Sequence, residues 1–261
     1  MDITQSDQEY CRSQAEKHDR DRYILTLAAP VAARPALWAI LAFNHEIAKT
    51  REVVRDAHAG HLRLAWWREK LSAFYVGEEM PAHEVARALG NAIKQYQLPQ
   101  NDFEALIDAR GFDLDGAIPA SLDGLAAYVS TTNAPLVNLF ANVLGTECSD
   151  DLATAWGLIG IIRALPYVSA QNRCFLPMPM LHDIGLMPEQ FHHLKPSPAL
   201  SAAVQTIATR AQDHLSKAQP DALLFKRMKK MCVIYLKQMH KAGYNPFALH
   251  PVPFLGLRIL F

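Results

Sequence analysis

The chain has 261 residues, half of them apolar, and its 26 basic residues balance 26 acidic residues to a formal net charge of zero. The neutral balance argues against the strongly basic surface of many nucleic-acid-binding proteins, so we expect no nucleic-acid partner. This length and apolar content allow one substantial core, and we expect residues 1–261 to form a single domain.

The periodicity of the apolar residues predicts an all-α fold. The first long helix is expected at residues 36–59, which contain neither Gly nor Pro and follow Pro35, a residue suited to a first helical turn. Apolar stripes predict helices around residues 64–74 and 85–96. Further helices are expected at residues 102–108, 121–132, 135–144, 149–170, 188–193, 199–218 and 223–242, and the proline-containing tail 244–261 is expected to be extended and packed.

The N-terminal ten residues are polar and acidic, unlike a signal peptide or a transit peptide. The apolar stretches 23–43 and 152–168 both contain Arg and Pro, so we expect neither to cross a membrane as an uninterrupted helix. The four cysteines show no C-x-x-C spacing and suggest neither a zinc site nor a disulfide framework. We expect a cytoplasmic protein, with peripheral attachment to the inner membrane as an open alternative.

Residues 163–177 carry the most informative motif and read RALPYVSAQNRCFLP. This segment resembles the second signature of the squalene/phytoene synthase family, in which Arg163, Arg173 and residues 175–177 keep the frame. Catalytic members have aspartates at two positions of this signature, where the chain has Ala164 and Val168. Pro166 lies between them, so the helix is expected either to kink there or to end near Leu165.

Residues 41–52 resemble the first signature of the same family. Ala48, Lys49 and Glu52 stand at positions that are acidic in catalytic members, so one carboxylate remains and a lysine has entered. Segments 21–27, 67–77, 113–114 and 125–128 extend the resemblance over most of the chain. Segments 42–48 and 162–167 are most similar to one branch, which contains the mitochondrial complex I assembly factors with a squalene/phytoene synthase-like domain and their bacterial relatives.

The resemblance implies an isoprenoid-synthase-like helical bundle with a central cavity. Catalysis in the family begins with release of diphosphate, which requires Mg²⁺ held by carboxylates. With the vestigial signature positions Ala48, Glu52, Ala164 and Val168, we expect no catalytic residue, no metal site and no cofactor. The expected function is that of a catalytically degenerate binding or assembly factor, with a respiratory complex I subunit or assembly intermediate as its partner.

Two other functions remain open. The chain could be a Mg²⁺-dependent prenyl transferase that condenses two prenyl diphosphates, in which case Glu46 or Glu52 could hold residual metal. It could also be a metal-free carrier of an isoprenoid or a quinone, in which an anionic head group is bound by Lys49, Arg51, Arg163 and Arg173. For Arg163 and Arg173, the alternative is a structural role in tying helices together through carbonyls and carboxylates.

The C-terminal region is basic, because residues 222–261 contain seven cations and no acid. Lys226, Arg227, Lys229 and Lys230 flank an apolar stripe on the expected helix 223–242, so this helix could contact an anionic membrane surface. Packing of the stripe against the bundle, with a cationic outer surface, is compatible with that role.

Three clusters of titratable residues are interpreted as ordinary surface features. His58 with His61, and His192 with His193, lack a third metal ligand at a suitable spacing. Asp108, Asp113 and Asp115 define no shared helix face, so we expect them to lie in a solvated loop with capping roles.

Overall fold

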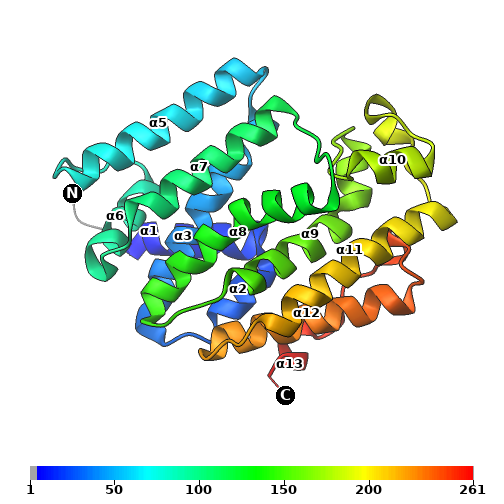
Figure 1. The fold of residues 1–261 in the computed structure, drawn as a ribbon. Coiled ribbons are helices and arrows are strands. Elements are labelled where there is room, and N and C mark those ends of the chain that lie inside the picture. The colour runs from blue at the N-terminus through cyan, green and yellow to red at the C-terminus, as the bar shows by residue number, and fades with distance from the viewer. Residues whose placement is uncertain (1–4, 261) are drawn as a thin grey trace. The chain divides into compact units, whose positions relative to one another are not determined.

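The computed structural model describes residues 5–260, which form helices joined by turns and contain no strand (Figure 1). The all-α prediction is therefore confirmed. The packing divides the chain into two compact units. Unit 1 comprises Met1–Asp115, Pro135–Cys148 and Asp221–Phe225, and unit 2 comprises Gly116–Ala134, Ser149–Pro220 and Lys226–Phe261. The single domain stays a prediction, and each unit is described by itself.

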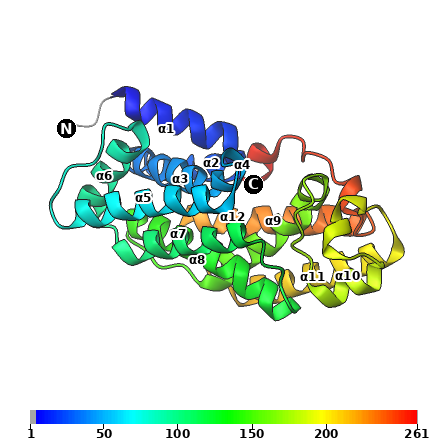
Figure 2. The ribbon, with the colours of Figure 1, turned by 90° about the horizontal axis from the view of Figure 1, so that it is seen from above.

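The N-terminal helices of unit 1 pack in two groups. Helices α1, α3 and α6 contact one another, and α5 lies beside α7, as both views show (Figures 1 and 2). Phe43 of α3 is buried in the interior. Its ring makes T-shaped contacts with the rings of Trp67 and Phe103, with centroid distances of 5.3 and 5.5 Å. The bounds are α1 (Gln5–His18), α2 (Arg20–Thr26), the 3-10 helix η1 (Val31–Ala33), α3 (Arg34–Ala48), α4 (Thr50–Val53), α5 (Ala57–Tyr75), α6 (Glu84–Tyr96) and α7 (Gln100–Asp115).

The single helix expected at residues 36–59 is wrong, because three helices cover this region. Pro35 does occupy the first turn of α3, as expected. Helix α3 ends at Ala48, and Val54 is extended after the short α4. Asp56 then caps the start of α5 by accepting a hydrogen bond from the Ala59 N–H. An aspartate before an apolar stretch is a start signal that the periodicity argument overlooked.

Most of unit 2 is built around the helix that carries the second signature. Helix α9 packs along α11, the short helices η2 and η3 contact α9, and α10 contacts α11 (Figure 1). Helix α8 lies in unit 2 up to Ala134 and in unit 1 from Pro135 onward, and α12 changes unit after Phe225. The bounds are α8 (Leu122–Leu144), α9 (Asp150–Ala170), α10 (Met178–Ile184), η2 (Pro188–His193), α11 (Pro198–Lys217), α12 (Leu223–Lys241), η3 (Pro246–Ala248) and α13 (Leu255–Arg258).

The helix boundary expected between residues 132 and 135 is also wrong, because the helices expected at 121–132 and 135–144 form one helix, α8, with Pro135 inside it. The helix expected at 149–170 is confirmed, because α9 spans Asp150–Ala170 and continues through Pro166 rather than ending near Leu165. The tail is not wholly extended, because it contains η3 and α13.

Glycine allows α8 and α9 to approach closely at one point. A Cβ atom at Gly157 would lie 2.6 Å from the Val129 Cβ and 2.7 Å from the Asn133 Nδ2. Those separations are shorter than van der Waals contact, so only glycine fits there without displacing α8. This contact fixes α9, and with it the second signature, within unit 2.

Helix α9 is long and apolar enough to span a membrane by length and composition. Of its most apolar 18-residue window, 67% is buried inside the structure. A core helix of a soluble protein has the same properties, so this helix carries no argument for a membrane span.

Candidate functional site

The first signature lies at the C-terminal end of α3 and in α4. Glu46 is buried within α3, Ala48 and Lys49 are partly exposed, and Glu52 is exposed on α4. The four residues therefore differ in their access to solvent. Of the two glutamates considered as metal ligands, Glu46 is buried and Glu52 is exposed.

Glu46 is bound by two cations. Lys49 Nζ lies 2.5 Å from Glu46 Oε1, and Arg63 Nη2 of α5 lies 2.6 Å from Glu46 Oε2. The side chain of Glu46 is only 4% exposed, whereas those of Lys49 and Arg63 are 25% and 33% exposed. A buried carboxylate is stable when both oxygens are satisfied by charged donors, and this pair of contacts does so. The predicted anion-binding residue Lys49 thus has an acidic partner within its own segment.

A second polar cluster joins α3 and α4 to α7. Arg51 donates a hydrogen bond to the backbone carbonyl of Asp113. Arg110 donates to Asp113 Oδ2 and to Asn44 Oδ1, both at 3.2 Å. Asp108, Asp113 and Asp115 all lie within α7 and Asp113 is buried, so the expectation of a solvated loop is wrong. The hydrogen bond to Asp113 gives Arg51 a structural role that was not among the expectations for this residue.

The histidine pairs of the sequence have ordinary polar partners. His61 Nε2 lies 3.0 Å from Asp115 Oδ1, with both side chains about half exposed or more. His192 and His193 are tilted neighbours, with ring centroids 4.0 Å apart, and the backbone N–H of His192 donates to Asn172. These contacts agree with the interpretation of both pairs as surface features.

A stacked histidine pair lies beside the first signature. The rings of His18 on α1 and His45 on α3 are parallel, with centroids 3.9 Å apart. Burial lowers the pKa of His45 from 6.5 to about 4, and the nearby His18 and Lys49 add to the effect, although Glu46 and Asp19 oppose it. The pKa of His18 is also lowered, mainly by burial. Both rings are therefore neutral at pH 7.

We expect this pair to make stability depend on pH. Between pH 6.5 and about 4, the unfolded chain binds a proton at His45 and the folded chain does not, so the free energy of unfolding falls as the pH falls through this window. Between pH 7 and pH 5 the loss is expected to be about 1 kcal/mol, after allowance for partial exposure. Urea unfolding at pH 5 and pH 7 measures it.

The matched comparison is between His45→Phe, which keeps a ring against His18, and His58→Phe at an exposed position. His45→Phe should lose less stability than the wild type between pH 7 and pH 5, whereas His58→Phe should follow the wild type. Identical pH dependence in all three proteins would contradict the assignment.

The second signature lies on α9 within unit 2. Ala164 is partly exposed and Val168 is buried. The exposed Arg163 lies over the ring of Tyr235 of α12, with its guanidinium carbon 3.7 Å from the ring centroid, and Tyr235 itself is buried. One turn further on, Tyr167 is 58% exposed. The result is a flat guanidinium, fixed by cation–π contact, beside an exposed aromatic side chain.

Arg173 follows α9 and has a separate aromatic partner. Its guanidinium carbon lies 5.5 Å from the ring centroid of Phe175, which stacks on Tyr128 of α8 at 5.7 Å. Arg173 and Arg163 thus contact different aromatic residues within unit 2. An arginine that stacks through its face can still donate hydrogen bonds from its edge, so both remain candidates for binding an anion or a partner.

Two of the four cations expected at a membrane surface have neighbours within unit 2. Lys226 is exposed, but Lys229 Nζ donates to the backbone carbonyl of Ala218, 2.7 Å away. Lys230 lies in a pocket together with residues of the C-terminal segment. The contact of Lys229 gives it a role in fixing the turn after α11.

The side chains of the two signatures do not fit a Mg²⁺ cluster. Ala164 and Val168 supply no oxygen, and Lys49 places an ammonium group against Glu46. Within residues 5–260, no group of three or more His, Cys, Asp or Glu residues is arranged to hold a metal ion. Mg²⁺ prefers an octahedral set of oxygens, including carboxylates, and neither signature provides one.

Sequence reasoning overlooked two arginines of this site. Arg63 and Arg110 bind the buried Glu46 and Asp113, and neither belongs to a signature. The available signal was indirect, because buried Asn44 and Glu46 in an otherwise apolar helix require polar partners from another helix.

Comparison with known proteins gives one matching family. The model of the squalene/phytoene synthase family matches residues 15–254 of the chain. A solved squalene synthase from Alicyclobacillus acidocaldarius superimposes with a TM-score of 0.78 at 21% identity, covering 93% of this chain and 96% of that one. The predicted isoprenoid-synthase-like bundle is therefore confirmed.

Two kinds of curated relative are similar in sequence. Complex I assembly factor 6 of Rattus norvegicus is 28% identical over 216 residues, which cover 80% of this chain and 65% of that protein. Presqualene diphosphate synthase of Zymomonas mobilis is 27% identical over 216 residues, covering 79% of this chain and 72% of that enzyme. The chain thus spans less than two thirds of the assembly factor, and one relative is named for assembly while the other is named for catalysis.

Proposed function

The chain belongs to the squalene/phytoene synthase family, and from this premise we propose that it is a catalytically degenerate member that acts as a binding or assembly factor linked to respiratory complex I. The observation that carries the proposal is the chemistry at the signature positions. Ala164 and Val168 replace two metal-binding carboxylates, and Lys49 has entered the first signature and binds Glu46. A site of this kind cannot neutralise a departing diphosphate through Mg²⁺.

Similarity to complex I assembly factor 6 supports the assembly role over other binding roles. We place the protein in the cytoplasm, with its site of action at the inner membrane surface, where a complex I intermediate would be encountered. Arg163 and Tyr167 are the side chains we propose for partner contact. Arg and Tyr are the residue types enriched at interface hot spots, and the buried Tyr235 fixes Arg163 in place before binding.

The prenyl transferase alternative rests on the similarity to presqualene diphosphate synthase. It would require metal binding by the carboxylates that remain, of which Glu46 and Asp113 are each bound by cationic side chains. The carrier alternative requires an open apolar space. Phe43 and Trp67 are fully buried against each other inside unit 1, so these two large side chains do not line such a space within that unit.

Deletion of the gene that encodes this chain, in its own organism, tests the proposal. We expect the NADH:quinone oxidoreductase activity of the membranes to fall several-fold, with an unchanged profile of squalene-derived and carotenoid lipids. The amount of assembled complex on native gels should fall in parallel. Normal complex I activity with loss of a terpenoid lipid would contradict the assembly role and favour the prenyl transferase.

Complementation of the deletion strain examines the arginines directly. Arg163→Gln combined with Arg173→Gln should fail to restore complex I activity, although its free energy of unfolding should change by about 0.5 kcal/mol or little more. Arg210→Gln, in the same unit and bound to exposed Asp123, is the matched control and should restore activity. A double variant that melts many degrees lower would instead assign both arginines to structure.

A further inference from the structure

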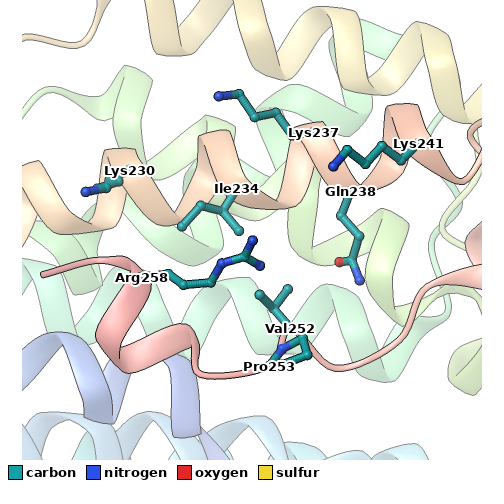
Figure 3. Close-up of a pocket in the computed structure, with 8 residues that line it drawn as sticks. All are labelled: Lys230, Ile234, Lys237, Gln238, Lys241, Val252, Pro253 and Arg258. Atoms are coloured by element: carbon teal, nitrogen blue, oxygen red, sulfur yellow. The ribbon is translucent and has the colours of Figure 1, made fainter. Parts of the chain in front are cut away.

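Unit 2 contains a pocket of about 400 Å³ between α12 and the C-terminal segment (Figure 3). Lys230, Lys237 and Lys241 contribute from α12, and Arg258 contributes from α13. Figure 3 shows the Arg258 guanidinium between Ile234 of α12 and Val252 of the tail. The volume lies within the range of about 300–1,000 Å³ that is common for small-molecule sites.

The helical period explains why the lysines gather there. Lys230, Ile234, Lys237 and Lys241 follow one another at spacings of four, three and four residues, so they share one face of α12. The opposite face carries Met228, Cys232, Tyr235 and Met239, which are buried. Burial of this apolar stripe leaves the three lysines on the solvent-facing side of α12, where they line the pocket.

The pocket is positively charged without an acidic neighbour in its lining. Residues 222–261 contain no Asp or Glu, and within residues 5–260 no salt bridge involves any of the four cations of the pocket. Like charges at such spacings repel one another in the free protein. A bound anion would remove this repulsion, and a phosphate accepts hydrogen bonds from both ammonium and guanidinium groups.

Large apolar side chains are exposed in the C-terminal segment that lines this pocket. Phe254 is 77% exposed, Leu257 is 57% exposed and Leu260 is 48% exposed, and Phe254 and Leu257 are the sequence neighbours of the pocket residues Pro253 and Arg258. Phe254 has a φ of 54°, in the left-handed region that an aromatic residue rarely adopts. Leu255 and Ile259 of the same short segment are buried, so the segment is anchored while Phe254 and Leu257 are exposed.

We propose that this pocket binds the phosphate headgroup of an anionic phospholipid, with Phe254, Leu257 and Leu260 inserted at the boundary between headgroups and acyl chains. The cations match the anionic headgroup layer of a membrane interface. The adjacent phenylalanine and two leucines match the apolar layer beneath it. A soluble phosphate compound would use the cations but not the exposed apolar side chains. The inference is independent of the link to complex I and identifies residues other than Lys226, Arg227 and Lys229 as the lipid contact.

Co-sedimentation of the full chain with vesicles tests the proposal. We expect binding to vesicles that contain phosphatidylglycerol in phosphatidylcholine, weak binding to pure phosphatidylcholine, and loss of binding near 0.5 M salt. Lys237→Gln combined with Arg258→Gln should lower the partition coefficient about 30-fold, from the contribution expected of two cations at such a surface. Phe254→Ser combined with Leu257→Ser should also weaken binding, without changing the charge.

The control is Lys195→Gln combined with Lys217→Gln, which removes the same charge from exposed positions of unit 2 outside the pocket. Thermal melting confirms that all variants are folded. Equal binding by the pocket variant and the control would overturn the proposal. Binding of glycerol phosphate by the free protein, measured calorimetrically, with no binding to vesicles would also overturn it, in favour of a soluble phosphate ligand.

Discussion

Replacing Arg63 with Met is expected to lower the free energy of unfolding by about 3 kcal/mol. The side chain of Glu46 is 4% exposed, and Arg63 satisfies one of its two oxygens at 2.6 Å. Removal of this partner leaves a buried carboxylate with Lys49 alone. Breaking a buried ion pair on one side costs about 3–5 kcal/mol, and the remaining lysine places the expected value at the lower end of that range. Urea unfolding at pH 7 measures the change.

Two further variants separate the buried charge from the loss of packing. Glu46→Gln in the Arg63→Met background should recover much of the lost stability, because it removes the uncompensated charge. Arg68→Met on the same helix breaks an exposed pair with Asp108 and should cost about 0.5 kcal/mol or less. If Arg63→Met were as stable as Arg68→Met, Glu46 would not depend on this partner and could again be considered a ligand of the site.

The sequence predicted the helices best where the apolar pattern is long and bounded by clear signals. Residues 149–170 were expected as a helix, and α9 covers Asp150–Ala170. The prediction failed where the pattern continues across a break, as between α3 and α5, because periodicity alone does not detect a short change of direction. It also failed at Pro135, since a proline costs one hydrogen bond but does not always end a helix that is packed on its neighbours.

The candidate site was predictable in its motifs and not in its contacts. Positions 48, 164 and 168 can be read from the sequence, and the family resemblance identifies them as acidic, metal-binding positions in catalytic members. The partners of Glu46 and Asn44 are Arg63 and Arg110, which lie 17 and 66 residues away from them. Such pairs depend on which helix faces meet, and the period of one helix does not contain that information. For the same reason, the expectation that Lys49 and Arg51 bind an anionic head group did not include their contacts with Glu46 and Asp113.

The C-terminal pocket was likewise predictable in its composition and not in its contacts. The absence of acids from residues 222–261 predicted a basic end, and the stripe of α12 predicted a buried face. The pocket itself forms because Val252, Pro253 and Arg258 lie against that helix (Figure 3). The tail was expected to be extended and packed, but its sequence did not indicate which helix it packs against.

The rate of diphosphate release is the property in which this chain is expected to differ most from a catalytic relative. The purified chain is expected to release no diphosphate from farnesyl or geranylgeranyl diphosphate with Mg²⁺ or Mn²⁺. Two carboxylates are missing at Ala164 and Val168, and a cation stands in the first signature at Lys49. In catalytic members of the family, release of diphosphate requires several negative charges on the leaving group to be neutralised at once. Loss of these metal ligands should therefore abolish turnover rather than reduce it.

The measurement that most directly tests the central claim is metal-dependent diphosphate release by the purified wild type, compared with a no-enzyme control and with Glu52→Gln. Our account predicts that all three give the same background rate with either metal, and that no condensed C30 or C40 product forms. Release by the wild type above the control, abolished by Glu52→Gln in a folded protein, would show that the site is a working prenyl transferase and would contradict the account.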